Sequence, residues 1–76
     1  MKTVKYFGHD VNVPDNATHL ATDHDGEIYA FYREPKLSGG VWLPRIKLGD
    51  DSQCHAVDYV RPGDIEYEDS LMEIKP

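Results

Sequence analysis

The alternation of apolar and polar positions is clearest on either side of residues 23–27, which read DHDGE. Two strand-like runs, residues 18–22 and 28–32, flank this segment. Asp is favoured where a turn begins, and Gly accepts the left-handed φ that closes a three-residue hairpin loop with a bulge. The pattern therefore predicts a central β-hairpin. A two-residue Asp25-Gly26 loop is the alternative, which would change the cross-strand partners and keep the hairpin.

The register of this hairpin decides which side chains share a face, because side chains alternate between the two faces of a strand. With the three-residue loop, Asp23 faces Glu27. One face then carries the apolar side chains expected to pack inward, Leu20, Ile28 and Ala30. The other face carries His19, Ala21, Tyr29 and Phe31. Its aromatic side chains either lie under another strand, as core residues, or point outward as candidate contacts for a partner.

Shorter strand-like runs precede the central hairpin. Residues 2–7 and 11–13 are rich in Val and aromatic side chains and flank Gly8-His9-Asp10, so we expect a short first hairpin that turns at these three residues. Residues 14–17 then read PDNA. Because Pro fixes φ and Asp and Asn bond their own backbone, this segment predicts a turn or a single helical turn.

Loop and strand signals alternate after the central hairpin. Residues 34–40, EPKLSGG, predict a loop. Residues 41–48 resume a strand pattern in which Trp42, Ile46 and Leu48 share one face. Pro44 lies within this run, which restricts it to an edge strand or a bulged strand. Residues 53–60 predict a last strand, with Val57 and Tyr59 on one side and Cys54 and Ala56 on the other.

The C-terminal tail has two interpretations. Asp69 could cap a final helical turn that carries Leu71, Met72 and Ile74, or the tail could add an extended segment. We therefore predict a mainly β fold, with α+β as the alternative, in one domain over residues 1–76. It would contain a small antiparallel sheet of about four to five strands, arranged as a hairpin meander, with at most one short helical turn near the C-terminus.

Length and cysteine content narrow the class of protein. A chain of 76 residues has room for one domain with a small core. Cys54 is the single cysteine, so an internal disulfide framework is excluded, which favours a reducing, cytoplasmic setting. Neither a signal-peptide pattern nor a membrane-spanning apolar run is found in the sequence, so we expect no membrane association.

The negative charge is concentrated in the last third of the chain. The formal net charge is −6; residues 1–48 hold six acids and six bases, and residues 49–76 hold eight acids and two bases. An acidic surface repels nucleic-acid backbones, so direct nucleic-acid binding is not expected. These acids form either a solvated face or a docking surface for a basic partner. The candidate partner-binding residues are Tyr29, Phe31, Trp42, Asp64, Glu66, Glu68 and Asp69.

Metal and catalytic patterns are weak. DHDGE resembles the start of a calcium loop, with Glu34 at the twelfth position, but the intervening residues are strand-like and turn chemistry explains the motif. Cys54 and His55 could contribute to a small metal site with other His residues, although neighbours on a strand point to opposite faces. No nucleophile, base and acid are suitably arranged, so we expect no enzyme and no cofactor.

Residues 13–31, VPDNATHLATDHDGEIYAF, resemble a pattern in small uncharacterised bacteriophage proteins, VPxxAxxxAxDxDGxIYAF. Those chains also carry a Trp-bearing strand comparable to VWLP and often an acidic tail like GDIEYEDSL. The resemblance implies a phage protein in the host bacterial cytoplasm. It also implies a non-enzymatic function, in which the protein binds and modulates or inhibits a host protein such as RNA polymerase, a nuclease or a defence complex.

Three alternatives stay open beside this expectation. The acidic third could imitate a nucleic-acid backbone and block a basic groove. Cys54 and His55 could serve a small metal-binding domain. The strand over residues 41–48 could pair with a second copy to form a homo-oligomer, although Pro44 would weaken that ladder.

Overall fold

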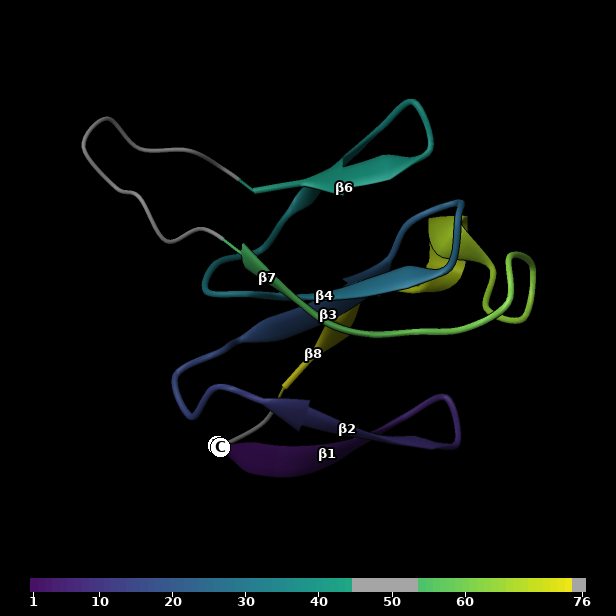
Figure 1. Cartoon of the computed structure of the whole chain (residues 1–76). Helices are drawn as coiled ribbons and strands as arrows, with labels where there is room; N and C mark the ends of the chain where they lie inside the picture. Colours follow the sequence, from purple (N-terminus) through teal and green to yellow (C-terminus); the bar gives the residue numbers. More distant parts are fainter. Residues whose placement is uncertain (45–53, 75–76) are drawn as a thin grey trace.

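The computed structural model describes residues 1–44 and 54–74, which form three antiparallel β layers (Figure 1). A four-stranded sheet lies in the middle, between the β1–β2 hairpin on one side and the β5–β6 hairpin on the other. The strands are β1 (Lys2–Tyr6), β2 (His9–Val13), β3 (His19–Thr22), β4 (Glu27–Phe31), β5 (Lys36–Ser38), β6 (Val41–Leu43), β7 (Cys54–Tyr59) and β8 (Met72–Glu73). The 3-10 turn η1 (Tyr67–Asp69) precedes β8. The predicted mainly β class with one short helical turn is confirmed.

The central hairpin has the register that its turn residues predict. Leu20 pairs with Ala30, and the Asp23 amide donates to the Glu27 carbonyl at 2.9 Å. The Gly26 amide donates to the Asp23 carbonyl at 3.0 Å, and Gly26 has a φ of 92°. The loop is therefore the three-residue one, and the two-residue alternative is not adopted.

Two further strands extend this hairpin into the order β7-β4-β3-β8. In the β4–β7 pairing, Ile28 faces Asp58 and Tyr29 faces Ala56, so Val57 is an extra residue that forms a β-bulge. The expected strict alternation, with Val57 and Tyr59 on one side, is wrong because the bulge intervenes. Val57 packs against the core on the Ile28 side of the sheet, whereas Tyr59 is 78% exposed.

The tail follows the extended alternative. Met72 pairs with Leu20 across β8 and β3, so the helical turn expected to carry Leu71, Met72 and Ile74 does not form. The 3-10 turn lies earlier in the chain, and Asp69 is its last residue rather than its cap. Because the tail returns to pair with β3, the sheet is not a simple meander.

The first hairpin turns one residue earlier than expected. Tyr6 pairs with His9, which leaves Phe7 and Gly8 as a two-residue loop instead of Gly8-His9-Asp10. Both loop residues have positive φ, 47° and 82°, as a two-residue turn that matches the strand twist requires. The predicted turn at residues 14–17 is confirmed, since the Ala17 amide donates to the Pro14 carbonyl at 3.1 Å.

A third hairpin replaces much of the loop expected at residues 34–40. β5 and β6 pair across Gly39 and Gly40, whose φ values are 57° and 88°. Paired glycines favour such a two-residue turn, and this signal accounts for the strand that the loop prediction missed. β6 ends at Leu43, before Pro44. The remainder of the predicted strand, with Ile46 and Leu48, lies outside the described residues.

The central sheet buries both of its faces. The first core cluster lies between this sheet and the β1–β2 hairpin and comprises Tyr6, Val11, Val13, Ala17, Leu20, Ile28, Ala30, Ile65 and Ile74. The second cluster lies on the opposite face and comprises Ala21, Phe31 and Trp42. Each outer hairpin therefore covers one face of the sheet.

Candidate functional site

Several turns meet at one end of the molecule, on the right in Figure 1. The His24 amide donates to the Gly40 carbonyl at 2.9 Å, which holds the β3–β4 turn beside the β5–β6 turn. The Val60 amide donates to the Gly26 carbonyl at 2.8 Å, which brings in the segment after β7. These backbone bonds position residues that are far apart in the sequence.

This end of the molecule carries a group of exposed acids. We name as the acidic end the side chains of Asp25, Glu27, Asp64, Glu66, Glu68 and Asp69, all exposed. Residues 23–27 and 60–69 contain one Lys or Arg, Arg61. Within residues 1–44 and 54–74, the ion pairs join the N-terminus to Asp15 and Lys5 to Asp10, so neither involves the acidic end. The four predicted acids of the last third thus belong to segments that lie at the same end of the molecule as two acids of the central hairpin.

Asp23 belongs to the same turn but is buried. Its carboxylate accepts a hydrogen bond of 2.9 Å from the Trp42 amide and ties the turn to β6. Burial raises the pKa of Asp23 above its usual 3.8, and the neighbouring charges of Asp25 and Glu27 add to this rise. Asp23 is therefore a structural residue of the turn.

The carboxylates of Asp23, Asp25 and Glu27 lie close enough to share a cation, with oxygens within 4.8 Å of one another. Each one already accepts a hydrogen bond from the protein. The Glu27 amide donates to Asp25 at 3.1 Å, and the Tyr29 hydroxyl donates to Glu27 at 2.6 Å. β4 separates the turn from Glu34, so the geometry of a twelve-residue calcium loop is not formed. The bonds of the turn account for this cluster.

The predicted aromatic contacts occupy different environments. Phe31 is fully buried and Trp42 is 9% exposed, so both follow the core alternative and neither offers an outward surface as a candidate contact. The β5–β6 hairpin covers their face, and the Trp42 indole N–H donates to the Tyr67 carbonyl at 2.8 Å. Tyr29 is half-buried, and its hydrogen bond to Glu27 raises the pKa of its hydroxyl to about 12.

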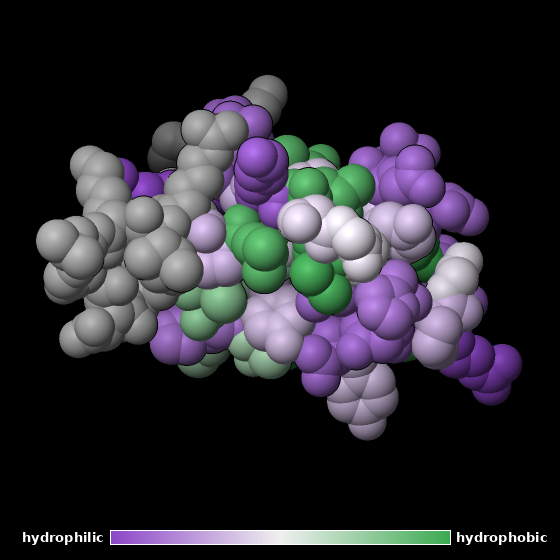
Figure 2. All heavy atoms as spheres, turned by 90° about the horizontal axis from the view of Figure 1, so that it is seen from above, coloured by the Kyte–Doolittle hydropathy of each residue, from purple (hydrophilic) through white to green (hydrophobic). Residues whose placement is uncertain are grey.

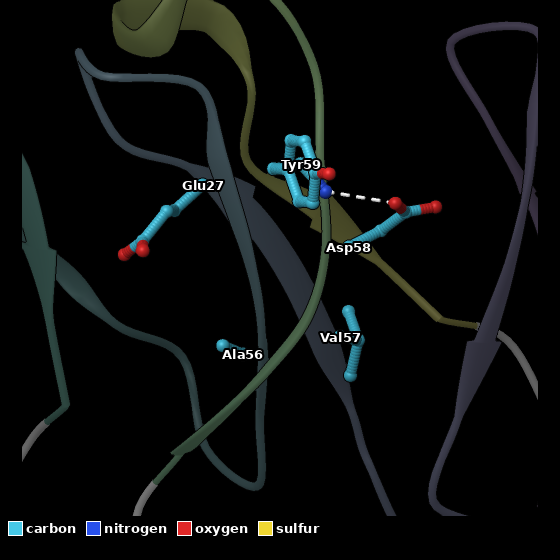
Figure 3. Close-up of a pocket in the computed structure, with 5 residues that line it drawn as sticks. All are labelled: Glu27, Ala56, Val57, Asp58 and Tyr59. Atoms are coloured by element: carbon cyan, nitrogen blue, oxygen red, sulfur yellow. Dashed lines mark hydrogen bonds between the residues drawn. The ribbon is translucent and has the colours of Figure 1, made fainter.

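Tyr59 is an exposed aromatic residue that the sequence prediction did not select. Two hollows open beside it along β7 and the segment that follows. The first, about 290 Å³, is lined by Glu27, Ala56, Val57, Asp58 and Tyr59 (Figure 3). The second, about 500 Å³, is lined by Asp25, Tyr59, Val60, Arg61 and Pro62. Because the bulge at Val57 decides how Tyr59 is oriented, strict alternation along the strand could not identify it.

Cys54 and His55 diverge on β7. Cys54 is half-buried against the second core cluster, whereas His55 is exposed and packs edge-on against Tyr32, with ring centroids 5.6 Å apart. Burial raises the pKa of the Cys54 thiol, which disfavours the thiolate that binds metal. In the described part of the chain, neither residue belongs to a group of three potential metal ligands.

A hydrophobic area lies on the outer face of the β5–β6 hairpin (Figure 2). Leu43 on β6 is 47% exposed. Hydrophilic side chains lie to the right of this area in the same view.

Comparisons with protein-family models, with curated proteins and with solved structures find no match to this chain. No helix in residues 1–44 and 54–74 is long and apolar enough to cross a membrane.

Proposed function

We propose that this chain is a non-enzymatic binding protein that attaches to a basic surface of another protein through its acidic end. The observation that carries the proposal is the gathering of six exposed acids from two distant segments, with Arg61 as the one Lys or Arg in those segments. A surface of one sign attracts a partner of the opposite sign and accelerates encounter, and it rejects partners of like charge.

The arrangement of these acids favours binding over catalysis. Asp64, Glu66, Glu68 and Asp69 are all exposed, and η1 places the last two on a short turn held by the Trp42 indole. Exposed carboxylates are accessible to the basic side chains of a partner, which suits electrostatic recognition. General acid–base catalysis would instead require a tuned acid and base that converge on one substrate position.

The resemblance to small bacteriophage proteins supplies the context of the proposal. We propose that the partner is a protein of the bacterial host, such as RNA polymerase, a nuclease or a defence complex, and that binding modulates or inhibits it. Proteins that handle nucleic acids carry basic grooves for the phosphate backbone. The acidic end would then act either as a plain docking surface or as an imitation of that backbone.

Capture from bacterial host lysate tests the proposal with two variants of equal charge change. The first, D64N/E66Q/E68Q/D69N, neutralises four acids of the acidic end. The control, D10N/D15N/E34Q/E73Q, neutralises four exposed acids elsewhere on the chain. We expect the wild-type protein and the control to retain one dominant partner, and the first variant to lose it. Equal retention by both variants would exclude the acidic end as the contact.

Competition then separates docking from imitation of nucleic acid. If the acids imitate a backbone, single- or double-stranded DNA should displace the captured partner. Binding should also weaken steeply as salt rises above about 0.1 M, where the screening length is about 10 Å. Retention of the partner at saturating DNA would identify a docking site outside its nucleic-acid groove.

A further inference from the structure

We propose that the outer edge of β7, centred on Tyr59, takes up an extended basic segment of the partner as an added strand. This inference rests on the proposed function and names its mode of contact. β7 is the terminal strand of the sheet order β7-β4-β3-β8, and no strand in the described residues pairs with its outer edge. An unpaired edge presents amide and carbonyl groups that an extended peptide can bond.

The hydrogen-bond pattern shows which groups face outward. The Val60 amide points to β4, where it bonds the Gly26 carbonyl. The preceding amide, that of Tyr59, turns to the other side and donates to the Asp58 carboxylate at 2.8 Å. Figure 3 shows this bond on the side of β7 away from Glu27. Asp58 thus occupies the place that a carbonyl of an incoming strand would take.

Ala56 supplies a second outward amide. Ala56 pairs with Tyr29 of β4. The bond from the Asp23 amide to the Glu27 carbonyl shows that the backbone groups of Glu27 point to β3. Because this direction alternates along a strand, the backbone groups of Tyr29, two residues later, also point to β3. Because the backbone groups of Tyr29 point away from β7, the Ala56 amide opposite it points away from β4. Ala56 is exposed, so a strand can approach it.

Charge complementarity identifies the occupant. The charge is clearest in the hollow along β7, where the carboxylates of Glu27 and Asp58 adjoin Tyr59; the second hollow holds Asp25 together with Arg61. An exposed tyrosine ring attracts Lys and Arg side chains through its π face. An incoming carbonyl would take the Tyr59 amide, and a Lys or Arg of the same strand would pair with the released Asp58 carboxylate. The edge therefore suits an extended segment with basic residues at alternate positions.

Two synthetic peptides of equal charge test the inference on the intact chain. Acetyl-KTKVKTKV-amide can add a strand, whereas acetyl-KPPKKPPK-amide has the same length and four Lys but places Pro on both edges of any strand it could form, so neither edge keeps a continuous row of backbone donors. Titrations followed by amide chemical shifts should show the first peptide binding at least about tenfold more tightly, with the largest shifts at Ala56 and Tyr59. Equal affinities would show charge attraction alone and overturn the strand addition.

Two substitutions complete the test. Ala56→Pro removes an outward donor at an edge position where Pro is tolerated, and it should abolish the preference between the peptides, whereas Ala56→Thr should keep it. Tyr59→Ala should weaken the binding of acetyl-KTKVKTKV-amide by about tenfold. A preference unchanged in Ala56→Pro would overturn the proposal, as would self-association through β7. Loss of the lysate partner on neutralising the acidic end would still support the proposed function, so the two can fail separately.

Discussion

Tyr6 and Ser70, which lie 64 positions apart in the chain, are joined by a buried hydrogen bond of 2.8 Å from the tyrosine hydroxyl to the serine carbonyl. Because that hydroxyl has one proton, its contact of 2.7 Å with Thr22 must be a bond that Thr22 donates. The Ser70 hydroxyl in turn accepts from the Thr22 amide at 2.9 Å. This network fixes the tail against β3 and the first hairpin.

Tyr6→Phe should therefore destabilise the fold. The substitution removes one hydrogen-bond partner from each of two buried groups, the Thr22 hydroxyl and the Ser70 carbonyl. We expect the free energy of unfolding to fall by about 1–3 kcal/mol. Urea unfolding measures the loss as a shift in midpoint. Tyr32→Phe is the matched control, since Tyr32 is half-buried and its hydroxyl makes no hydrogen bond to the described residues. Equal stability losses in the two variants would contradict the importance of the network.

Gly26→Ala should be more harmful than Gly63→Ala. Both glycines have a φ of 92°, so an alanine is strained at either position by about 1 kcal/mol. A Cβ on Gly26 would lie 2.1 Å from the Val60 carbonyl oxygen, whereas one on Gly63 would meet nothing within 4 Å. The difference between the melting temperatures of the two variants measures the stability lost through the close approach of the new Cβ to the Val60 carbonyl. Matching melting temperatures would mean that the β7 end can move away from the turn.

Asp23→Asn should reduce the pH dependence of stability. The pKa of Asp23 is raised in the folded protein above its usual 3.8, so the folded state holds this proton more tightly than the unfolded chain does. Its contribution to stability is therefore greatest below about pH 4 and falls as pH rises through the folded-state pKa. Asn keeps an oxygen for the Trp42 amide and carries no charge.

Urea unfolding measures the difference in stability between the two proteins from about pH 4, near the usual pKa of a carboxyl group, to about pH 7, well above it. We expect the wild-type protein to lose stability relative to Asp23→Asn as the pH rises. Asp23→Ala, which removes the bond to Trp42, should be less stable than Asp23→Asn throughout. Parallel pH profiles for the wild-type protein and Asp23→Asn would show that Asp23 titrates alike in both states.

Glu27→Gln should lower the pKa of Tyr29. The value of about 12 arises first from the hydrogen bond that the tyrosine donates to the Glu27 carboxylate, because the bond favours the protonated hydroxyl. Removing the carboxylate charge should return the pKa toward 10. Ultraviolet titration of tyrosinate, with Tyr29→Phe to assign the signal, measures the change. An unaltered Tyr29 titration in Glu27→Gln would contradict this bond.

Local sequence determined the central hairpin. Asp and Gly in residues 23–27 predict a three-residue loop, and that loop sets the pairing of Leu20 with Ala30. Turn geometry depends on the few residues within the turn, so it can be inferred without the rest of the fold. The paired glycines at residues 39 and 40 carried a similar local signal for the third hairpin.

Tertiary structure decided which surfaces are buried and which remain exposed. The alternation that separates Phe31 from Leu20 does not say whether a second layer covers the Phe31 face; the β5–β6 hairpin covers it. The bulge at Val57 similarly ended the alternation that would have oriented Tyr59. The acids of residues 64–69 join those of the central turn only because β7 returns to pair with β4. Such contacts depend on long-range packing, so the sequence determined the hairpin and the three-dimensional fold assembled the acidic end.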